Sequence, residues 1–355
     1  MSKPKVLLII DRIMIGGAEQ VFVDILKLIN HRVEAKVLLI SSSEPNQILR
    51  IQGIAPYYEL NRKYKFSIRA IIQTNMLMCS ADILHVHLRP TLRYVNFVRF
   101  LTFNRTKLVY HDHHHIGQLS FIQEMLMYKI IKVDYYIAVN RDVLKWARNK
   151  WNFTTGSAYL LNLPKIKNET PFEGNTSVNL EGIQQLAFVC VGNIKKSKNQ
   201  LFAASFALKV VQSILFYGNN QDKTYFDLVS NIEGVTVVSG EDNPVQHFGM
   251  FKFGLCSSFA ESGPLVILEY FVSGLPFLSY RTGGIADVLY QYVPEYFMDT
   301  FEMQDWIERY EALNSNYKRI PQELIDRVIE KEFNQDVYAK SLLEIYNKCL
   351  KNASL

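Results

Sequence analysis

The 355-residue sequence has no long hydrophobic run, which excludes a protein that crosses a membrane by an apolar helix. The charged start Met1–Lys5 followed by the apolar run Val6–Ile10 superficially resembles a signal peptide. That run has only five residues and a glycine pair follows it, which is typical of a buried first strand. No stretch approaches the ~20 apolar residues that span a bilayer. The sequence therefore predicts a protein that is soluble or lies on a membrane surface.

Cysteines are also few, and the four that occur are far apart and form no CxxC pair. We interpret them as small buried apolar groups in a reduced, cytoplasmic compartment. The formal net charge of +5 is modest and indicates mild attraction to phosphates or anionic lipids. No recognised nucleic-acid module is present, so nucleic acid is not an expected partner.

Short apolar runs alternate with longer helical patterns along most of the chain, which predicts the α/β class with doubly wound parallel sheets. In the first half we expect strands at Lys5–Ile10, Ala35–Ile40, Ile83–Val86, Lys107–Tyr110, Tyr135–Val139 and Ala158–Leu161. In the second half we expect them at Gln185–Val191, Ser213–Tyr217, Gly234–Val238, Phe253–Ser257 and Pro276–Ser279. Helices are expected at Ala18–Ile29, Asn199–Val211, Pro264–Ser273, Gln304–Asn314, Pro321–Glu330 and Gln335–Leu350.

Residues 163–183 interrupt this alternation with Pro164, Pro171 and Gly174 among many polar residues. We interpret this stretch as a linker between two Rossmann-like domains at 1–162 and 184–334, followed by a last amphipathic segment at 335–355. Ligands of open α/β sheets bind at the carboxyl ends of the strands. A site is therefore expected in a cleft between the two carboxyl edges.

Two clusters in the first half could bind a polar ligand. Gly16 and Gly17 stand between the first strand and the first helix, where backbone and helix N-terminus can approach an anion or form an ordinary tight turn. Histidines follow two strands, as His85 and His87 and as a run from His111 to His115. Alternation places His111, His113 and His115 on one side. We expect one or two of them to hold a polar substrate rather than a metal ion.

The second half carries a lysine-rich turn at Gly192–Gln200, directly after a predicted strand. Its three lysines precede a helix and can neutralise the charge of a diphosphate leaving group. A solvated basic turn is the structural alternative.

The strongest signal is the segment Glu261–Glu269, in which Ser262, Gly263 and Pro264 lead into a helix. Proline suits a first helical turn, and the free amides of Leu265 and Val266 can hold phosphate oxygens. Glu261 precedes the helix and can meet a sugar. Glu269, about two turns further along, can accept hydrogen bonds from a ribose diol. The bland alternative is a pair of solvent-facing glutamates, which the apolar surroundings disfavour.

The order of these features resembles the GT-B glycosyltransferases, specifically the large retaining family 4, over nearly the whole chain. The resemblance rests on residues 16–19, 81–87, 110–113, 192–198, on Glu261 and Glu269, and on 282–284 with 287–289. The ending 333–346 resembles the family's C-terminal helix, which packs back on the first domain.

This resemblance implies a role for single residues. Glu269 is expected to bind the nucleotide ribose, Glu261 the donor-sugar hydroxyls, and His113 the sugar from the N-terminal domain. Lys198 matches the family's phosphate lysine, and Gly192 belongs to the same turn. Gly16 and Gly17 would approach the donor phosphates or the acceptor. The catalytic set is thus His113, Glu261 and Lys198.

One position departs from the family, because Asn193 stands where an arginine usually follows the glycine. Asparagine supplies neither the charge nor the bidentate fork that an arginine gives a diphosphate. Either Lys195 or Lys196 substitutes for it, or the enzyme is slow, or the position contributes little here.

The resemblance implies transfer with retention of configuration from a nucleoside-diphosphate sugar, by the family's commonest usage a UDP-sugar, without a metal or other cofactor. No carboxylate nucleophile is evident beside His113. This favours front-face attack over a double displacement.

Basic residues interleave with aromatic ones at Leu60–Arg69 and Arg89–Arg105, on probable helices. Arg62, Lys63, Lys65, Arg93 and Arg99 are the candidate contacts with an acceptor or an anionic membrane. Their stems could equally cover an aromatic core edge. We expect a glycan acceptor, lipid-linked as in capsule, O-antigen or lipopolysaccharide synthesis, and an enzyme on the inner face of the cytoplasmic membrane.

Two alternatives share this fold: a nucleotide-sugar epimerase, and a non-catalytic subunit that binds a nucleotide sugar or glycan, which Asn193 favours. A NAD-dependent dehydrogenase is disfavoured because neither half carries GxGxxG followed by an acidic residue ~20 positions on.

Overall fold

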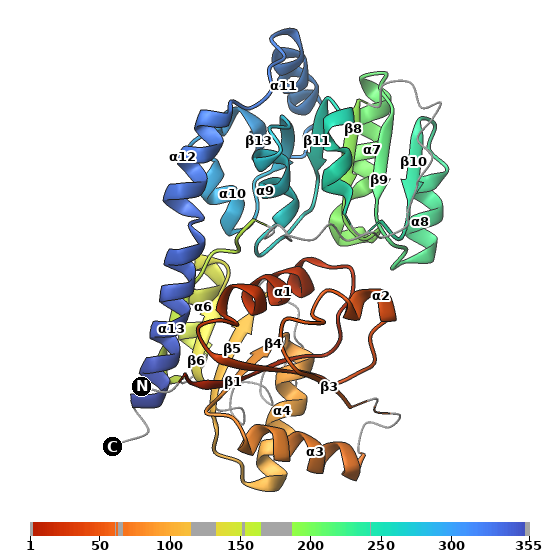
Figure 1. Ribbon diagram of the computed structural model, residues 1–355. Coiled ribbons are helices and arrows are strands. Elements are labelled where there is room, and N and C mark those ends of the chain that lie inside the picture. Colours follow the sequence, from red (N-terminus) through yellow and green to blue (C-terminus); the bar gives the residue numbers. More distant parts are fainter. Residues whose placement is uncertain are drawn as a thin grey trace. The chain divides into compact units, whose positions relative to one another are not determined.

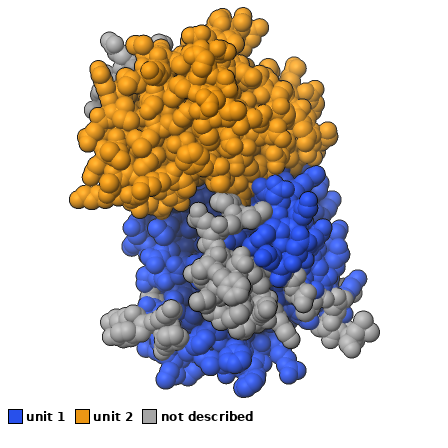
Figure 2. Space-filling view, turned by 180° about the vertical axis from the view of Figure 1, so that it is seen from behind, with its two compact units in different colours: residues 1–163, 334–355 blue, residues 164–333 orange. Residues whose placement is uncertain are grey.

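The computed structural model describes residues 3–60, 62, 67–114, 133–150, 153–164, 187–241 and 243–351. The chain forms two compact units, which Figure 2 colours separately. Unit 1 contains residues 1–163 and 334–355, and unit 2 contains residues 164–333. Each unit has its own all-parallel sheet, which confirms the expected α/β class with two Rossmann-like domains. Most of the predicted linker, residues 165–183, lies outside the described residues.

Unit 1 is built on a seven-stranded sheet in the order β3-β2-β1-β4-β5-β6-β7 (Figure 1). Its strands are β1 (Lys5–Ile10), β2 (Glu34–Leu39), β3 (Tyr57–Glu59), β4 (Ile83–His87), β5 (Lys107–Asp112), β6 (Val133–Ala138) and β7 (Phe153–Tyr159). Its helices are α1 (Gly17–Ile29), α2 (Pro45–Ile48), α3 (Ile68–Cys79), α4 (Arg89–Thr102), α6 (Arg141–Lys150) and α13 (Gln335–Lys351). The C-terminal helix α13 packs on α1 and on strands β4, β5 and β6.

Unit 2 repeats the plan with a six-stranded sheet in the order β10-β9-β8-β11-β12-β13. Its strands are β8 (Phe188–Val191), β9 (Ile214–Tyr217), β10 (Val235–Val238), β11 (Phe253–Cys256), β12 (Phe277–Tyr280) and β13 (Phe297–Met298). Its α-helices are α7 (Gln200–Lys209), α8 (Lys223–Ser230), α9 (Leu265–Val272), α10 (Gly284–Leu289), α11 (Met303–Ser315) and α12 (Gln322–Glu332). Three 3-10 helices join them: η1 (Lys196–Lys198), η2 (Pro244–Met250) and η3 (Pro294–Tyr296).

The central strands are apolar on both faces because helices cover both sides of a parallel sheet. Five of the six residues of β1 are buried, and all four residues of β9 and of β11 are buried. Consecutive apolar residues, rather than alternating ones, therefore made these strands recognisable in the sequence.

The structure differs from the sequence prediction in several places. β7 begins at Phe153 and ends at Tyr159, so the predicted strand Ala158–Leu161 was placed too late. The edge strands β3 and β13 were missed because three and two residues carry no readable pattern. Leu60 follows β3 and is not helical, and the next helix begins at Ile68. None of the helices in the described ranges is both long and apolar enough to cross a bilayer.

Candidate functional site

Three loops of unit 2 meet at the carboxyl ends of neighbouring strands. They follow β8, β11 and β12, which lie side by side in the sheet. The strand order reverses between β8 and β11, and this switch point is where open α/β sheets bind their ligands. The first loop holds the lysine turn, and the second leads into the predicted Glu261–Glu269 segment.

The lysine turn starts at a glycine with unusual backbone geometry. Gly192 has φ +150°, a region that side chains rarely adopt, and its amide donates to the Tyr217 carbonyl at 2.8 Å. A Cβ at this position would lie 3.7 Å from Cε of Lys198. The turn thus curls around the lysine side chain, and it is the backbone conformation at Gly192 that favours glycine there.

Lys198 forms an ion pair with Glu261 from the neighbouring loop. Their side chains are 26% and 17% exposed, so the pair is partly withdrawn from water. Burial alone would lower the pKa of the Lys198 ammonium, but the Glu261 carboxylate outweighs it and the pKa is raised. Lys198 therefore stays charged, as a group that binds a diphosphate must.

Hydrogen bonds fasten the loop after β11 to the lysine turn. The Ser257 hydroxyl donates to the carbonyls of Lys198 and Asn199 at 3.2 and 2.9 Å. The Phe259 amide donates to the Ser197 carbonyl at 3.1 Å. The two sequence motifs, about 60 residues apart, are therefore one structural element.

A third loop, after β12, braces the same segment from its other side. The Glu261 amide donates to Oγ1 of Thr282 at 3.1 Å, and the Gly284 amide donates to the Ser262 carbonyl at 2.9 Å. Gly283 has φ +86°, and a Cβ there would lie 2.7 Å from Cδ of Pro264. In the sequence this loop contributed only to the family resemblance, and no role was predicted for it. Its Gly-Gly pair before a helix was the available signal.

Helix α9 is anchored by a residue that the sequence prediction did not single out. The Tyr270 hydroxyl donates to the carbonyls of Val189 and Leu255, at 3.1 and 3.3 Å. Gly254 makes room for this ring, since a Cβ there would lie 2.6 Å from Cδ2 of Tyr270. The helix is thereby tied to β8 and β11, the two strands at the switch point.

The N-terminus of α9 has the features of an anion site. The helix begins at Leu265 after the N-cap Pro264, and its first turn carries no acidic residue. The first amides of a helix lack intrahelical partners and carry the positive end of its dipole. Leu265 and Val266 are half-buried, and so is Glu269 one turn further along. Ser262 is buried and Gly263 half-buried in the same loop.

The two lysines that could replace the missing arginine have different environments. Lys195 is half-buried, and burial, with repulsion by Lys198, lowers its pKa although Glu261 opposes this. Lys196 is exposed. Asn193 is occupied through its backbone, because its carbonyl accepts from Nε2 of Gln200 at 2.9 Å. Lys195 is therefore the lysine of the two that interacts electrostatically with Lys198 and Glu261.

In unit 1 the first turn carries a carboxyl group beside its two glycines. Gly16 is the N-cap of α1 in extended conformation, and Gly17 is its first residue. The carboxylate of Glu19 folds back against Gly16, where a Cβ would collide with it. Burial raises the pKa of this carboxyl, although its own backbone and Arg50 lower it. The turn has the glycines that sequence reasoning identified, with a carboxyl group among them.

His113 belongs to a cluster of four imidazoles on β4 and β5. Its Nε2 lies 2.9 Å from Nδ1 of His87, and its ring stacks on His111 with centroids 4.4 Å apart. Burial lowers the pKa of His113 to about 3, although the Asp112 carboxylate raises it. The imidazole is therefore neutral near pH 7. His115 lies outside the described residues.

Asp112 points away from this cluster and is fully buried. Its carboxylate accepts from the Tyr136 hydroxyl at 2.8 Å, the Arg89 guanidinium at 3.2 Å and the His114 amide at 3.0 Å. Burial would raise the pKa of Asp112, but these partners hold it well below its usual range. Asp112 thus fixes the strand end from which His113 emerges.

Residues 185–316 match the family model described as "Glycosyl transferases group 1". The match contains the lysine turn, the Glu261–Glu269 segment and the bracing loop. The chain carries a group 1 glycosyltransferase domain. The predictions of a GT-B family and of a glycosyltransferase are thereby confirmed at the level of the domain family.

Solved structures share the fold over nearly the whole chain. The HepE protein of Anabaena, in complex with UDP and glucose, superposes with a TM-score of 0.79 at 16% identity, covering 97% of this chain and 99% of that one. A glycosyltransferase of Rickettsia africae reaches a TM-score of 0.72 at 12% identity, covering 99% and 100%. The lipopolysaccharide outer core galactosyltransferase WaaB reaches 0.65 at 15%, covering 99% and 100%. A search of curated proteins finds no match.

The basic residues that the sequence predicts to contact an acceptor or a membrane lie in different environments. Arg62 lies over the Tyr94 ring at 4.4 Å, and Arg93 is exposed on α4. Arg99 donates to Oδ1 of Asn96 at 3.2 Å and to the Thr106 carbonyl at 3.0 Å. Arg99 thus closes the end of its own helix, so its head group is engaged within the chain. Lys63 and Lys65 lie outside the described residues.

Proposed function

We propose that the chain is a retaining glycosyltransferase that moves a sugar from a nucleoside-diphosphate sugar, a UDP-sugar, to a hydroxyl of a glycan acceptor. The observation that carries this proposal is the convergence of Lys198, Glu261 and the N-terminus of α9 at one sheet edge. These groups lie inside the matched family domain. Complexes of the Anabaena relative with UDP and with UDP-glucose support the choice of nucleotide.

Each part of the proposed donor site has the chemistry that its role requires. The diphosphate takes charge-assisted hydrogen bonds from Lys198 and backbone amides at Leu265 and Val266. The Glu269 carboxylate accepts from the ribose hydroxyls, and Glu261 accepts from hydroxyls of the sugar. The Gly192 turn supplies a close backbone approach.

The phosphate groups displace Lys198 from part of its contact with Glu261. In the ligand-free chain the pair holds both side chains in place. When the diphosphate shares the ammonium, the carboxylate gains freedom to meet the sugar. Phosphate binding and sugar binding are therefore coupled through one ion pair, and such pre-set groups favour the transition state when they face the developing charge.

The proposed transfer step is a front-face displacement. The bond between the anomeric carbon and the phosphate oxygen breaks, and its electron pair stays with the nucleoside diphosphate. The acceptor oxygen forms the new bond to the same carbon, and its proton passes to the departing phosphate oxygen. Lys198 and the α9 amides stabilise the negative charge that develops there. We assign to His113 the contact with the donor sugar that the family resemblance implies.

The test of this proposal is transfer of a labelled sugar from a panel of nucleoside-diphosphate sugars to an added glycan. We expect a glycoside with the donor's anomeric configuration, and loss of transfer in Lys198→Met with a folded protein. A stable covalent glycosyl-enzyme would contradict the front-face step. Inversion of configuration would contradict the retaining class.

For the acceptor, we propose a glycan held on a lipid at an anionic membrane surface. The support is an apolar ridge on α3 and α4, which lie next to each other in unit 1 (Figure 1). Its members are Ile68, Ile72, Met76, Phe100, Leu101 and Phe103, all exposed. The first three recur every four residues and form one stripe of α3. Phe103, with 86% of its side chain exposed, is hard to explain on a surface that meets only water.

The charge around this ridge matches anionic headgroups. Residues 61–111 contain nine lysines and arginines, and Asp82 is their single acidic residue. Arg69, Arg93 and Arg105 are exposed in the same stretch of the chain. Each basic residue near an anionic surface contributes roughly 1 kcal/mol, and the apolar side chains add to it by burial. The structural neighbour WaaB is named as a lipopolysaccharide outer core galactosyltransferase.

Vesicle sedimentation tests this part of the proposal. We expect binding to vesicles that contain anionic lipid, little binding to neutral ones, and loss of binding in the double variant Ile72→Ser with Met76→Ser. Leu208 and Leu228, exposed on unit 2, supply the matched control double variant. Equal binding by both double variants would overturn the membrane role of α3 and α4 while leaving the transfer chemistry untouched.

Asn193 favours one alternative, a subunit that binds a nucleotide sugar without transferring it. Purified protein that binds UDP-sugars but neither transfers nor hydrolyses them would support it. Conversion of the donor to its epimer without any acceptor would instead support the epimerase.

A further inference from the structure

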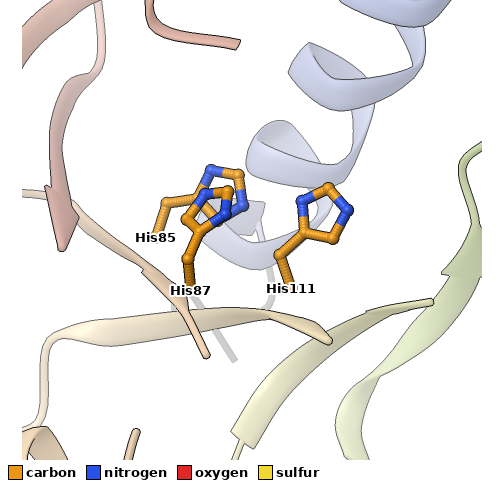
Figure 3. Close-up of side chains that lie close together, drawn as sticks. All are labelled: His85, His87 and His111. Atoms are coloured by element: carbon orange, nitrogen blue, oxygen red, sulfur yellow. The ribbon is translucent and has the colours of Figure 1, made fainter. Parts of the chain in front are cut away.

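Three buried imidazoles lie on one face of the unit 1 sheet. His85 and His87 are two residues apart on β4, so both point to the same side, and His87 is the register partner of His111 on β5. Figure 3 shows all three side chains pointing toward the helix above the strands. One nitrogen from each can be chosen so that all lie within 4.8 Å of one another. None of the three side chains is accessible to water.

The free nitrogens of this cluster are unusual in a protein core. In the described part of the chain, Nε2 of His85, Nε2 of His87 and both ring nitrogens of His111 are buried without a hydrogen-bond partner. Leaving one buried polar group unsatisfied costs about 1–3 kcal/mol. Four such atoms on three neighbouring rings would weaken the unit considerably unless something bonds them.

The hydrogen bonds that do exist prepare two rings as ligands. Nδ1 of His85 lies 2.7 Å from the Tyr346 hydroxyl, which comes from α13. Nδ1 of His87 lies 2.9 Å from Nε2 of His113. When both Nδ1 atoms carry the proton and donate, the two Nε2 atoms keep their lone pairs available for a ligand. A histidine that binds a metal ion has its other nitrogen fixed in this way by an outer partner.

We propose that His85, His87 and His111 bind a transition-metal ion, and Zn²⁺ is the ion that this ligand set suits best. Neutral imidazoles are common zinc ligands, and three of them leave one position for water or hydroxide. The absence of a thiolate or carboxylate among the three disfavours Cu⁺, Mg²⁺ and Ca²⁺. The three ligands are distinct from the residues proposed to bind the donor, although His113, the hydrogen-bond partner of His87, is itself assigned to the donor sugar.

The alternative explanation for this cluster is a stack of neutral histidines in the core, without a metal ion. The rings of His85 and His111 are nearly parallel, at 4° with centroids 5.6 Å apart, and such stacking occurs without a metal. Stacking contacts the ring faces, however, and leaves the in-plane nitrogen lone pairs unpaired. A metal ion bonds one nitrogen of each ring, which satisfies three of the four unpaired atoms, and for this reason we favour it.

The ion would cross-link β4 to β5 beneath α13, the helix whose contacts with both strands join the chain's last residues to its first domain. Tyr346 couples the two, because its hydroxyl bonds His85 while its ring is buried. Metal binding and the docking of α13 should therefore stabilise each other.

The experiment measures metal content and ligand geometry in the full-length chain. Protein produced with added zinc should retain about one ion per chain after dialysis, and Co²⁺ should replace it with the visible absorption of a four-coordinate site. His111→Ala should lose both signals. His31→Ala, at an exposed position, should keep both.

Tyr346→Phe keeps the tertiary packing and removes only the outer partner of His85. We expect its affinity for Zn²⁺ to fall by about 10–100-fold, a change that a purely structural tyrosine would not cause. Protein that retains less than about a tenth of an ion per chain and gives no Co²⁺ absorption would overturn the site. Because neither readout needs a sugar donor, the proposed transfer activity would survive that result.

Discussion

Replacing Gly283 by alanine tests how the bracing loop holds the predicted donor segment. Gly283 has φ +86°, and its missing side chain leaves room for Pro264 and for the backbone of Glu261 and Ser262. A Cβ would lie 2.7 Å from Cδ of Pro264 and 2.9 Å from the Glu261 carbonyl oxygen. Both neighbours are parts of the backbone or of a rigid ring, so neither can simply rotate away.

Two destabilising contributions add up in Gly283→Ala: strain of the backbone and steric overlap of the new Cβ. A non-glycine residue in the left-handed region costs roughly 1–2 kcal/mol. Overpacking against the segment costs typically a further ~1–3 kcal/mol. We therefore expect Gly283→Ala to lower the free energy of unfolding of unit 2 by about 2–5 kcal/mol, and to weaken UDP binding because the segment is displaced.

Gly240 serves as a control that has the backbone strain without the steric overlap. Its φ is +81°, and a Cβ there would meet nothing within 4 Å. Gly240→Ala should therefore cost only the backbone term of about 1–2 kcal/mol and leave UDP binding unchanged. Urea unfolding and UDP titration of both variants give the comparison. Equal stability losses and equal UDP affinities would refute the claim that the loop after β12 positions the donor segment.

Three further outcomes follow from the same contacts. Glu261→Gln leaves the Lys198 ammonium without its carboxylate, so urea unfolding should show a loss of about 1.5–3 kcal/mol, whereas UDP, which lacks the donor sugar that Glu261 would contact, should still bind. Lys195→Ala should weaken UDP binding about tenfold in calorimetry, the equivalent of one charge-assisted hydrogen bond, while Lys196→Ala stays within about twofold; the reverse order would show that Lys196 replaces the arginine. Arg99→Ala should destabilise the chain by about 1–3 kcal/mol in thermal unfolding without affecting vesicle binding.

The sequence predicted the central strands well because each is a run of apolar residues bounded by glycine or polar residues. β1 was placed at Lys5–Ile10, where the structure has it. Edge strands such as Tyr57–Glu59 escape this reasoning, since their partner, rather than their composition, makes them strands. The same limit applies to helix α10, whose six residues give too short a pattern.

The sequence predicted individual residues of the candidate site but not the contacts between them. The motifs named Lys198 and Glu261, but their ion pair depends on the register of β8 and β11, which no local pattern encodes. The bracing by Thr282 and the anchoring by Tyr270 are likewise contacts between distant parts of the chain. The histidine cluster shows the limit most clearly. The expected partners of His111 were on its own strand, whereas His85 and His87 come from the neighbouring one.

The most direct test of the central claim is calorimetric titration of UDP into the wild-type chain, Glu269→Ala and the control Glu311→Ala, an exposed position on α11. The proposed donor site predicts that UDP binds the wild type and the control equally. It also predicts that Glu269→Ala loses about 1.5–3 kcal/mol of binding free energy, or roughly 10–150-fold in affinity. Equal UDP affinity in all three proteins, or no binding of any nucleoside diphosphate, would contradict it.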